Sequence, residues 1–157
     1  MTIFKGIFMG LNCTHNAFDG AYSAFNRFRQ AVCFIIGGSY PPHYLYQPDG
    51  QLTEVDGHIV YQKELDENRF YWGEGRTPKE NPGLWEFLTH SDCDGSISPS
   101  MCKKVANELE ELVPAMRELN WEAHGHLERN GGYAATLEQF IAGCRAAHKA
   151  RQSLKFR

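Results

Sequence analysis

The chain has 157 residues, of which 42% are hydrophobic and 22% charged, a composition typical of a folded domain and not of a disordered or fibrous protein. This length suits one core, so we expect a single domain over residues 1–157. The formal net charge of −3 excludes an overall field that would draw the molecule to nucleic acid or to an anionic membrane. Nucleic acid is therefore not an expected partner.

The cysteines and the first residues of the chain indicate in which cellular compartment we expect the protein. There are five cysteines and no C-x-x-C pair, which argues against a disulfide framework and against a cysteine-only zinc site. The pattern is typical of reduced thiols and predicts a cytoplasmic protein. The first residues lack a secretory signal pattern and no apolar run could span a bilayer, so we expect no membrane partner.

The first third of the chain predicts a strand, a loop and a helix. Residues 2–11 are apolar and β-prone, as in a buried strand, and residues 12–20 are rich in turn formers. From residue 21 to about 36 apolar side chains recur every three or four positions, which predicts an amphipathic helix with Asp19 as its N-cap. Gly37-Gly38 ends this helix.

The middle of the chain predicts a small sheet. Residues 43–72 alternate aromatic and polar side chains and contain two Asp-Gly turn signals, Asp49-Gly50 and Asp56-Gly57. This pattern is typical of an antiparallel meander.

The second half of the chain predicts helices. Asn81 precedes a proline and opens a short helix at 82–88, and Ser98 precedes a proline in the same way and opens a longer helix that Pro114 should kink or end. Gly131-Gly132 leads into the clearest amphipathic stripe. We therefore expect an α+β fold, a single compact domain with three main helices plus a short helix packed with a small antiparallel sheet.

The densest group of polar, chemistry-bearing residues is segment 90–95. Asp92 and Asp94 followed by a glycine are similar to part of a calcium loop, in which carboxylates bind the ion. The match is incomplete, because the first loop position would fall on His90 and the twelfth, normally a glutamate, on Met101. Calcium binding is therefore disfavoured.

Two other interpretations of the same segment stay open. It could be a structural corner in which Gly95 takes a positive φ, which explains the aspartates and the glycine but not His90. Cys93 could be a nucleophile near an imidazolium, but the flanking carboxylates Asp92 and Asp94 raise a thiol pKa and suppress the thiolate. An inert, packed thiol is favoured.

A metal site is an alternative. His124 and His126 lie two residues apart and could bind a divalent metal together with His90 and Asp92, which would activate water in a metal-dependent hydrolase. No high-specificity ligand spacing is present, and histidines on a surface loop are the simpler interpretation. We therefore expect no cofactor.

Basic residues and one glycine give weaker indications. Arg27 or Arg29 could donate paired hydrogen bonds to a phosphate or carboxylate, and Gly143 inside a helix indicates close packing against a neighbour or ligand. The C-terminal part of the chain carries a cluster of cations that is either a local anion-binding patch or a solvated helix face: Arg145, Lys149, Arg151, Lys155 and Arg157.

Four segments carry a resemblance to a known family: GGSYPPH at 37–43, PGLWEFLTHSDCDG at 82–95, GGY at 131–133 and FIAGCRAA at 140–147. In these segments the chain resembles a family of small uncharacterised bacterial, often actinobacterial, and phage proteins. The resemblance implies a compact cytosolic domain and brings no activity with it. A phage connection would favour an accessory role, such as sequestering a host signal.

Together these observations favour a non-enzymatic domain that binds a small, nucleotide-like molecule. Aromatic rings would stack on the ligand and polar groups would orient it. The predicted pocket residues are Tyr40, His43, Trp85, His90, Asp92, Asp94, Tyr133 and Arg145. The alternatives are the metal-dependent hydrolase and an inhibitor or immunity-type module that binds a host protein.

Overall fold

The structure is a computed structural model that describes residues 10–38, 40, 52–55, 58–61, 72, 75–119 and 132–157. Within these residues it has five α-helices and three two-stranded antiparallel sheets. The predicted α+β class is confirmed.

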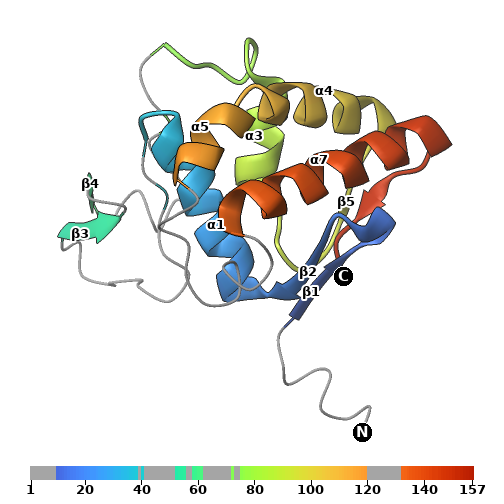
Figure 1. The fold of residues 1–157 in the computed structure, drawn as a ribbon, viewed down its shortest axis with the longest axis horizontal. Helices are drawn as coiled ribbons and strands as arrows, with labels where there is room; N and C mark the ends of the chain where they lie inside the picture. The colour runs from blue at the N-terminus through green and yellow to red at the C-terminus, as the bar shows by residue number, and fades with distance from the viewer. Residues whose placement is uncertain are drawn as a thin grey trace, which may run out of the picture.

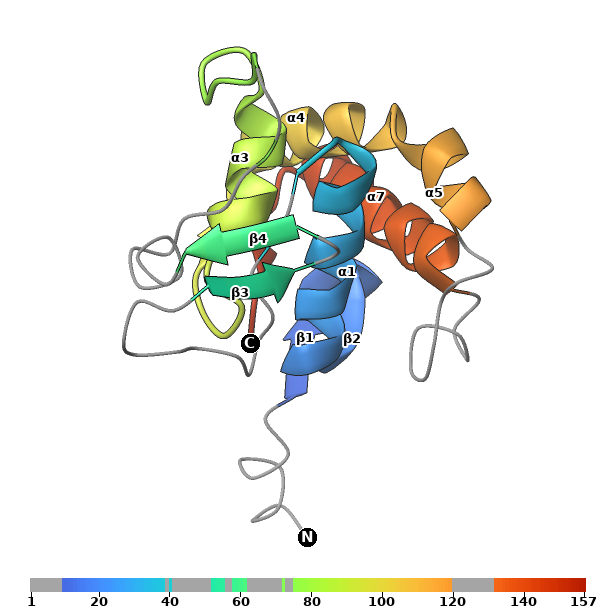
Figure 2. The ribbon, with the colours of Figure 1, turned by 90° about the vertical axis from the view of Figure 1, so that its left-hand side faces the viewer.

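The helices form the body of the molecule (Figure 1). Their bounds are α1 Tyr22–Ile35, α3 Pro82–Thr89, α4 Pro99–Glu110, α5 Val113–Leu119 and α7 Gly132–Ala150. Helix α7, the longest, packs along α4 and α5, and α3 packs against α4. Seen from the side, α1 stands between α3 and α7 (Figure 2).

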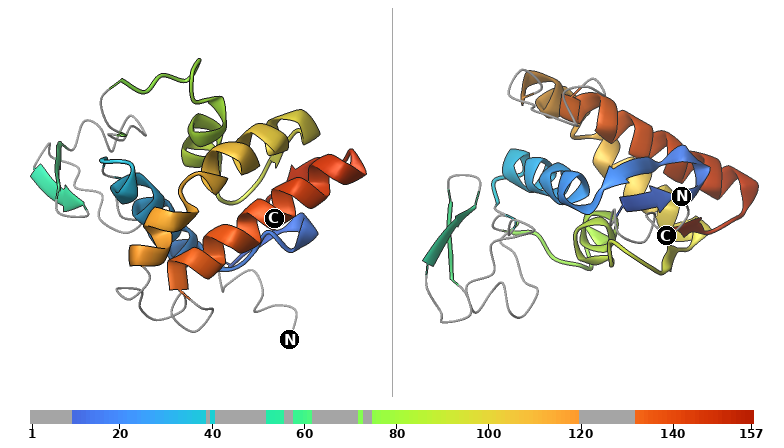
Figure 3. Two further views of the ribbon diagram at one scale, coloured as in Figure 1. Left: turned by 45° about the horizontal axis from the view of Figure 1, so that its top comes forward. Right: turned by 90° about the horizontal axis from the view of Figure 1, so that it is seen from below.

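The strands are short. β1 (Gly10–Cys13) pairs with β2 (Phe18–Ala21), and the 3-10 helix η2 (Thr14–Asn16) lies in their connection; β3 (Leu52–Val55) pairs with β4 (His58–Tyr61), and β5 (Ser96–Ile97) with β6 (Leu154–Lys155). Just after β6, Phe156 bridges Cys13 of β1. The C-terminal segment therefore lies between β5 and β1, and the view from below shows it beside the β1–β2 hairpin (Figure 3).

Phenylalanines from four parts of the chain fill the centre of the core. Phe25 of α1 contacts Phe87 of α3 and Phe156 after β6, each at 5.9 Å between ring centroids. Phe87 in turn lies 5.2 Å from Phe140 of α7. Edge-to-face aromatic pairs of this kind add stability beyond the area that they bury. This cluster fixes the positions of α1, α3, α7 and the C-terminal segment relative to one another.

The predicted loop over residues 12–20 is wrong, because the β1–β2 hairpin occupies it. Asp19 lies within β2 and does not cap the helix, which begins at Tyr22 with no side-chain cap. The buried and exposed residues of β1 alternate, with Leu11 and Cys13 inside. Four-residue strands around a polar turn give too short an alternation to stand out from the turn formers between them. The last two residues of the strand predicted over residues 2–11 lie in β1, and residues 2–9 of it lie outside the described residues.

The short helix predicted at 82–88 is confirmed as α3, but its N-terminus is held differently. Asn81 precedes it without a side-chain hydrogen bond. Instead the carboxylate of Glu108 on α4 accepts hydrogen bonds from the backbone nitrogens of Gly83, at 2.9 Å, and Leu84, at 3.0 Å. A carboxylate at a helix N-terminus satisfies unpaired N–H groups and complements the helix dipole.

The predicted start of the next helix is confirmed, since the Ser98 hydroxyl caps α4 by accepting a hydrogen bond from Met101 N at 3.2 Å. The spacing predicts that Pro114 kinks or ends this helix; in the structure α4 ends at Glu110 and Pro114 lies in the first turn of α5. Proline is tolerated there because a first-turn N–H has no partner in the helix.

Part of the predicted meander is confirmed by the β3–β4 hairpin, in which Val55 pairs with His58. The Asp56-Gly57 turn signal falls between these two residues. It lies outside the described residues, as does Asp49-Gly50.

Candidate functional site

Segment 90–95, which we call the acidic corner, follows α3 and is closed by its own hydrogen bonds. The His90 ring nitrogens lie 2.7 Å from the carbonyl oxygen of Ser91 and 3.1 Å from that of Ser96. Gly95 has a φ of +84°, as the interpretation as a structural corner predicted. The imidazole thus spans the turn that the glycine allows.

The acidic corner is also attached to the C-terminal segment. The His90 ring lies 4.2 Å from the Phe156 ring, centroid to centroid, and Phe156 N donates to Gly95 O at 3.0 Å. One face of the imidazole is therefore occupied by a core aromatic side chain.

Arg29 holds the corner from inside the molecule. It is buried, and its guanidinium donates to the carbonyl of His90 and, at 3.4 Å, to the hydroxyl of Tyr40. The Tyr40 hydroxyl donates onward to Leu88 O at 2.7 Å, and the guanidinium lies 4.6 Å from the centroid of the Phe25 ring. A cation at the C-terminal end of α3 suits the helix dipole. Arg29 therefore binds neutral acceptors of the protein itself.

The carboxylates of the acidic corner are available to solvent, Asp94 being exposed and Asp92 half-buried. No group of three or more His, Cys, Asp or Glu side chains that could hold a metal ion occurs in the described part of the chain. His124 and His126 lie outside that part. The alternative of a divalent metal site with His90 and Asp92 therefore stays a prediction.

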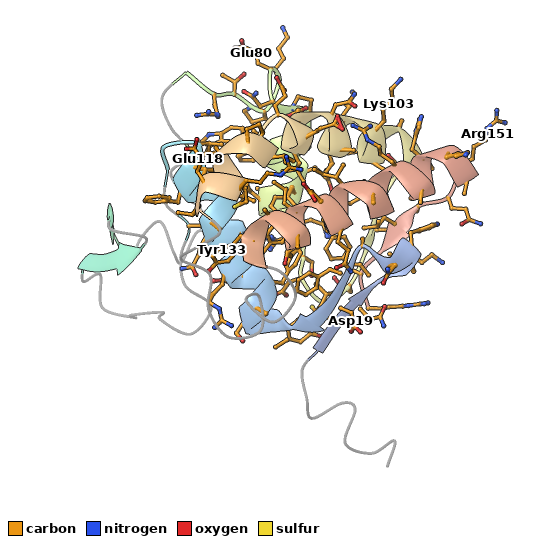
Figure 4. All side chains as sticks on the ribbon, in the orientation of Figure 1. Asp19, Glu80, Lys103, Glu118, Tyr133 and Arg151 are labelled. Carbon is orange, nitrogen blue, oxygen red and sulfur yellow. The ribbon has the colours of Figure 1, made fainter. Side chains whose placement is uncertain are left out.

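The remaining predicted pocket residues lie in different places, and His43 is outside the described residues. Arg145 forms a salt bridge with Glu110 of α4 at 2.8 Å, and Tyr133 lies near the other end of α7, roughly 18 Å away along the helix (Figure 4). Trp85 is 40% exposed, and its ring centroid lies 5.4 Å from that of Trp72. Arg29 brings Tyr40 and His90 together by binding the hydroxyl of one and the carbonyl of the other.

All five cysteines are free, and only Cys93, in the acidic corner, is exposed. Burial raises the pKa of Cys13 to about 12, against the opposing effect of the Arg29 charge. The hydrogen bond that the Cys144 thiol donates to Cys102, together with burial, raises the pKa of Cys144. Cys13 and Cys144 are therefore neutral thiols at ordinary pH and are not poised as nucleophiles.

A second region is hollowed. A cavity of about 480 Å³ is lined by Thr14, His15, Gln152, Ser153, Lys155 and Arg157, and we call it the basic hollow. Lys155 and Arg157 are exposed, whereas Leu154 and Phe156, which alternate with them along the chain, are buried, as in a strand. None of the six wall residues has a carboxylate side chain. Neither Lys155 nor Arg157 forms an ion pair with any described residue.

Hydrogen bonds join the two walls of the basic hollow. His15 Nε2 lies 2.9 Å from Gln152 Oε1, although these residues are 137 positions apart in the chain, and His15 Nδ1 lies 3.1 Å from Thr14 Oγ1. The backbone nitrogen of Lys155 donates to Thr14 Oγ1 at 2.8 Å. The sequence indicated Lys155 and Arg157 as members of a basic patch. It gave no signal for Thr14 and His15, which come from the other end of the chain.

The backbone around the basic hollow is strained. Of the described residues other than glycine, three have a positive φ: His15 at 59°, Asn16 at 58° and Arg151 at 57°. His15 is a wall residue, Asn16 follows it, and Arg151 precedes the wall residue Gln152. A left-handed conformation costs a non-glycine residue about 1 kcal/mol, and such strain concentrates at functional sites.

Comparison of the chain with known protein families, with curated proteins and with solved structures finds no match. The resemblance to bacterial and phage proteins therefore stays a prediction. In the described residues no helix combines the length and the apolar character needed to cross a membrane.

Proposed function

We propose that the chain binds a small, phosphate-bearing ligand of the nucleotide type in the basic hollow and catalyses no reaction on it. The observation that carries this proposal is a pair of cations, Lys155 and Arg157, that form no ion pair with any described residue and lie on the walls of a cavity lined by no carboxylate side chain. The protein has a net charge of −3, so this positive character is local. A volume of about 480 Å³ is in the range of small-molecule sites.

The other wall residues add neutral hydrogen-bond donors. Ser153 and Gln152 line the cavity and carry a hydroxyl and an amide, and the Gln152 amide oxygen contacts His15. Charge-assisted bonds from lysine and arginine to phosphate are roughly twice as strong as neutral ones. The cations would supply most of the affinity and the neutral donors the orientation.

The proposal moves the binding site away from the predicted aromatic pocket. None of the six wall residues is aromatic, and Tyr40 is buried with its hydroxyl bonded to Leu88 O. The phosphate, and not the base, would therefore carry the recognition, with the rest of the ligand at the open side of the cavity. Both ring nitrogens of His15 contact protein side chains.

We further propose a reducing, cytoplasmic setting, in line with the five free thiols. Sequestering a phosphorylated signal is the accessory role that the sequence resemblance to bacterial and phage proteins would suggest. Neither point is needed for the binding proposal.

The test is calorimetric titration with inorganic phosphate and with 5′-AMP at constant ionic strength, together with thermal unfolding. A ligand present at one hundred times its Kd should stabilise the fold by about 2.7 kcal/mol. Lys155→Ala should weaken binding at least about tenfold, because it removes a charge-assisted bond. Lys79→Ala is the matched control, since Lys79 is exposed in the turn before α3 and is not a wall residue. Absence of binding, or equal loss in both variants, would overturn the proposal.

A further inference from the structure

We infer that the basic hollow selects a terminal phosphate monoester over a phosphodiester. This inference rests on the proposed function and names the ligand class more narrowly. A phosphate monoester carries a charge of about −1.5 to −2 at pH 7, whereas each phosphate of a diester carries about one negative charge. The side chains of Lys155 and Arg157 supply two permanent positive charges that form no ion pair with a described residue. The more highly charged monoester gains more from these two side chains than the diester does.

The placement of the two cations supports one phosphate group and not a row of them. Lys155 and Arg157 stand two residues apart on the same face of an extended segment, which separates their Cα atoms by roughly 7 Å. Long side chains at that spacing can converge on one group. A chain of diesters would need cations that continue along the groove, and the other wall residues are a histidine, two hydroxyl residues and an amide.

The number of walls also fits a terminal phosphate. A monoester presents three strong acceptor oxygens. The basic hollow offers three groups of donors: the Lys155 and Arg157 cations, the Gln152 amide with Ser153, and the η2 wall of Thr14 and His15. A diester has one oxygen fewer outside its ester links, so one wall would face an oxygen that carries no charge.

The η2 wall can donate only in one arrangement of its protons. Thr14 Oγ1 already accepts from Lys155 N, and His15 lies between this hydroxyl and Gln152 Oε1. When the imidazole carries both protons, it donates to Gln152 and to Thr14, and the Thr14 hydroxyl proton can turn outward to a ligand.

The experiment compares 5′-AMP with 3′,5′-cyclic AMP, which share base and sugar and differ in the ester state of the phosphate. A second pair, methyl phosphate and dimethyl phosphate, removes the nucleoside. At pH 7 and constant ionic strength, titration calorimetry should give a Kd at least about tenfold lower for the monoester in both pairs, the result of one further charge-assisted contact. Arg157→Ala should reduce that preference to about twofold or less, and Lys79→Ala should leave it unchanged.

The outcomes separate this inference from the proposed function. Binding of monoester and diester within about threefold of each other overturns the inference and leaves a general phosphate site. A preference that survives in Arg157→Ala also overturns it, because the selection would then not depend on the paired cations. Binding of neither class overturns the inference and the proposed function together. Circular dichroism of Arg157→Ala, an exposed position, checks that the fold is retained.

Discussion

The acidic corner and the basic hollow meet on the two faces of one short C-terminal segment. On the buried face Phe156 packs against His90, and on the exposed face Lys155 and Arg157 line the cavity. Each region is organised by a histidine with both ring nitrogens in contact. The partners of His90 are backbone carbonyls, which fix a turn, and the partners of His15 are side chains that join two walls. A polar string in the sequence can therefore be structural, whereas a site can be assembled from scattered residues.

The largest expected effect comes from Gly143→Ala, which tests how the hollow is positioned. A Cβ at Gly143 would lie 2.4 Å from the Cβ and 2.6 Å from the Cα of Ala17, next to η2. Because the contact includes backbone, we expect the free energy of unfolding to fall by about 3 kcal/mol, measured in urea. Glycine to alanine in an unhindered helix stabilises by about 1 kcal/mol, so a gain in stability would refute the close packing.

The second prediction separates the two regions directly. His90→Ala removes the ring that spans the acidic corner and packs on Phe156, so it should lower the free energy of unfolding by about 2 kcal/mol. Its affinity for phosphate should stay within about twofold of the parent. Lys155→Ala should do the reverse, leaving stability within about 0.5 kcal/mol while binding weakens.

Urea unfolding gives the free energy of unfolding of each variant, and calorimetric titration gives its Kd for phosphate. The comparison fails if His90→Ala loses as much phosphate affinity as Lys155→Ala. Such a result would mean that the acidic corner takes part in binding.

The sequence predicts well the elements whose signal is periodic or locally capped. The helices α1, α3 and α7 and the Ser98 cap of α4 follow from side-chain spacing and from residues next to each helix end. The predicted close packing at Gly143 is also found, and its neighbour is Ala17. In these cases the information lies within one turn of the residue concerned.

Neither the β5–β6 sheet nor the basic hollow could be predicted, because both depend on contacts between residues far apart in the chain. Two-residue strands have no measurable alternation, and their pairing depends on the whole core between Ile97 and Leu154. The contact between His15 and Gln152 joins positions 137 residues apart. The predicted pocket was chosen by residue chemistry alone. In the structure Arg145 forms a salt bridge with Glu110, and the Tyr40 hydroxyl accepts from Arg29 and donates to Leu88 O.

Alkaline pH tests the contact between Cys13 of β1 and the C-terminal segment. Cys13 bridges Phe156, and burial raises its pKa to about 12 from an ordinary value of 9.0. Above pH 9 the unfolded chain loses this proton while the native state keeps it. The stabilising contribution is therefore complete below that pH and is lost as the pH rises toward 12, by up to about 1.4 kcal/mol per pH unit.

The measurement is urea unfolding of the parent and of Cys13→Ala at several values between pH 8 and 10.5. The variant will be less stable at pH 8 because of the cavity, but its slope with pH should be smaller. Equal slopes would show that the thiol next to the C-terminal segment is not held neutral by the fold.

The smallest effect concerns Arg151, at the end of α7. Its φ of 57° and the hydrogen bonds from Arg151 N to His148 O and from Gln152 N to Ala147 O form a helix end in which glycine is the usual residue. Arg151→Gly should raise the free energy of unfolding by about 0.5–1 kcal/mol relative to Arg151→Ala, which loses the same charge but keeps the Cβ. Phosphate affinity should be equal in the two variants, because Gln152 keeps its place in the wall. If the alanine variant is the more stable, the backbone beside the basic hollow stores no strain, and the contrast with the relaxed glycine turn of the acidic corner disappears.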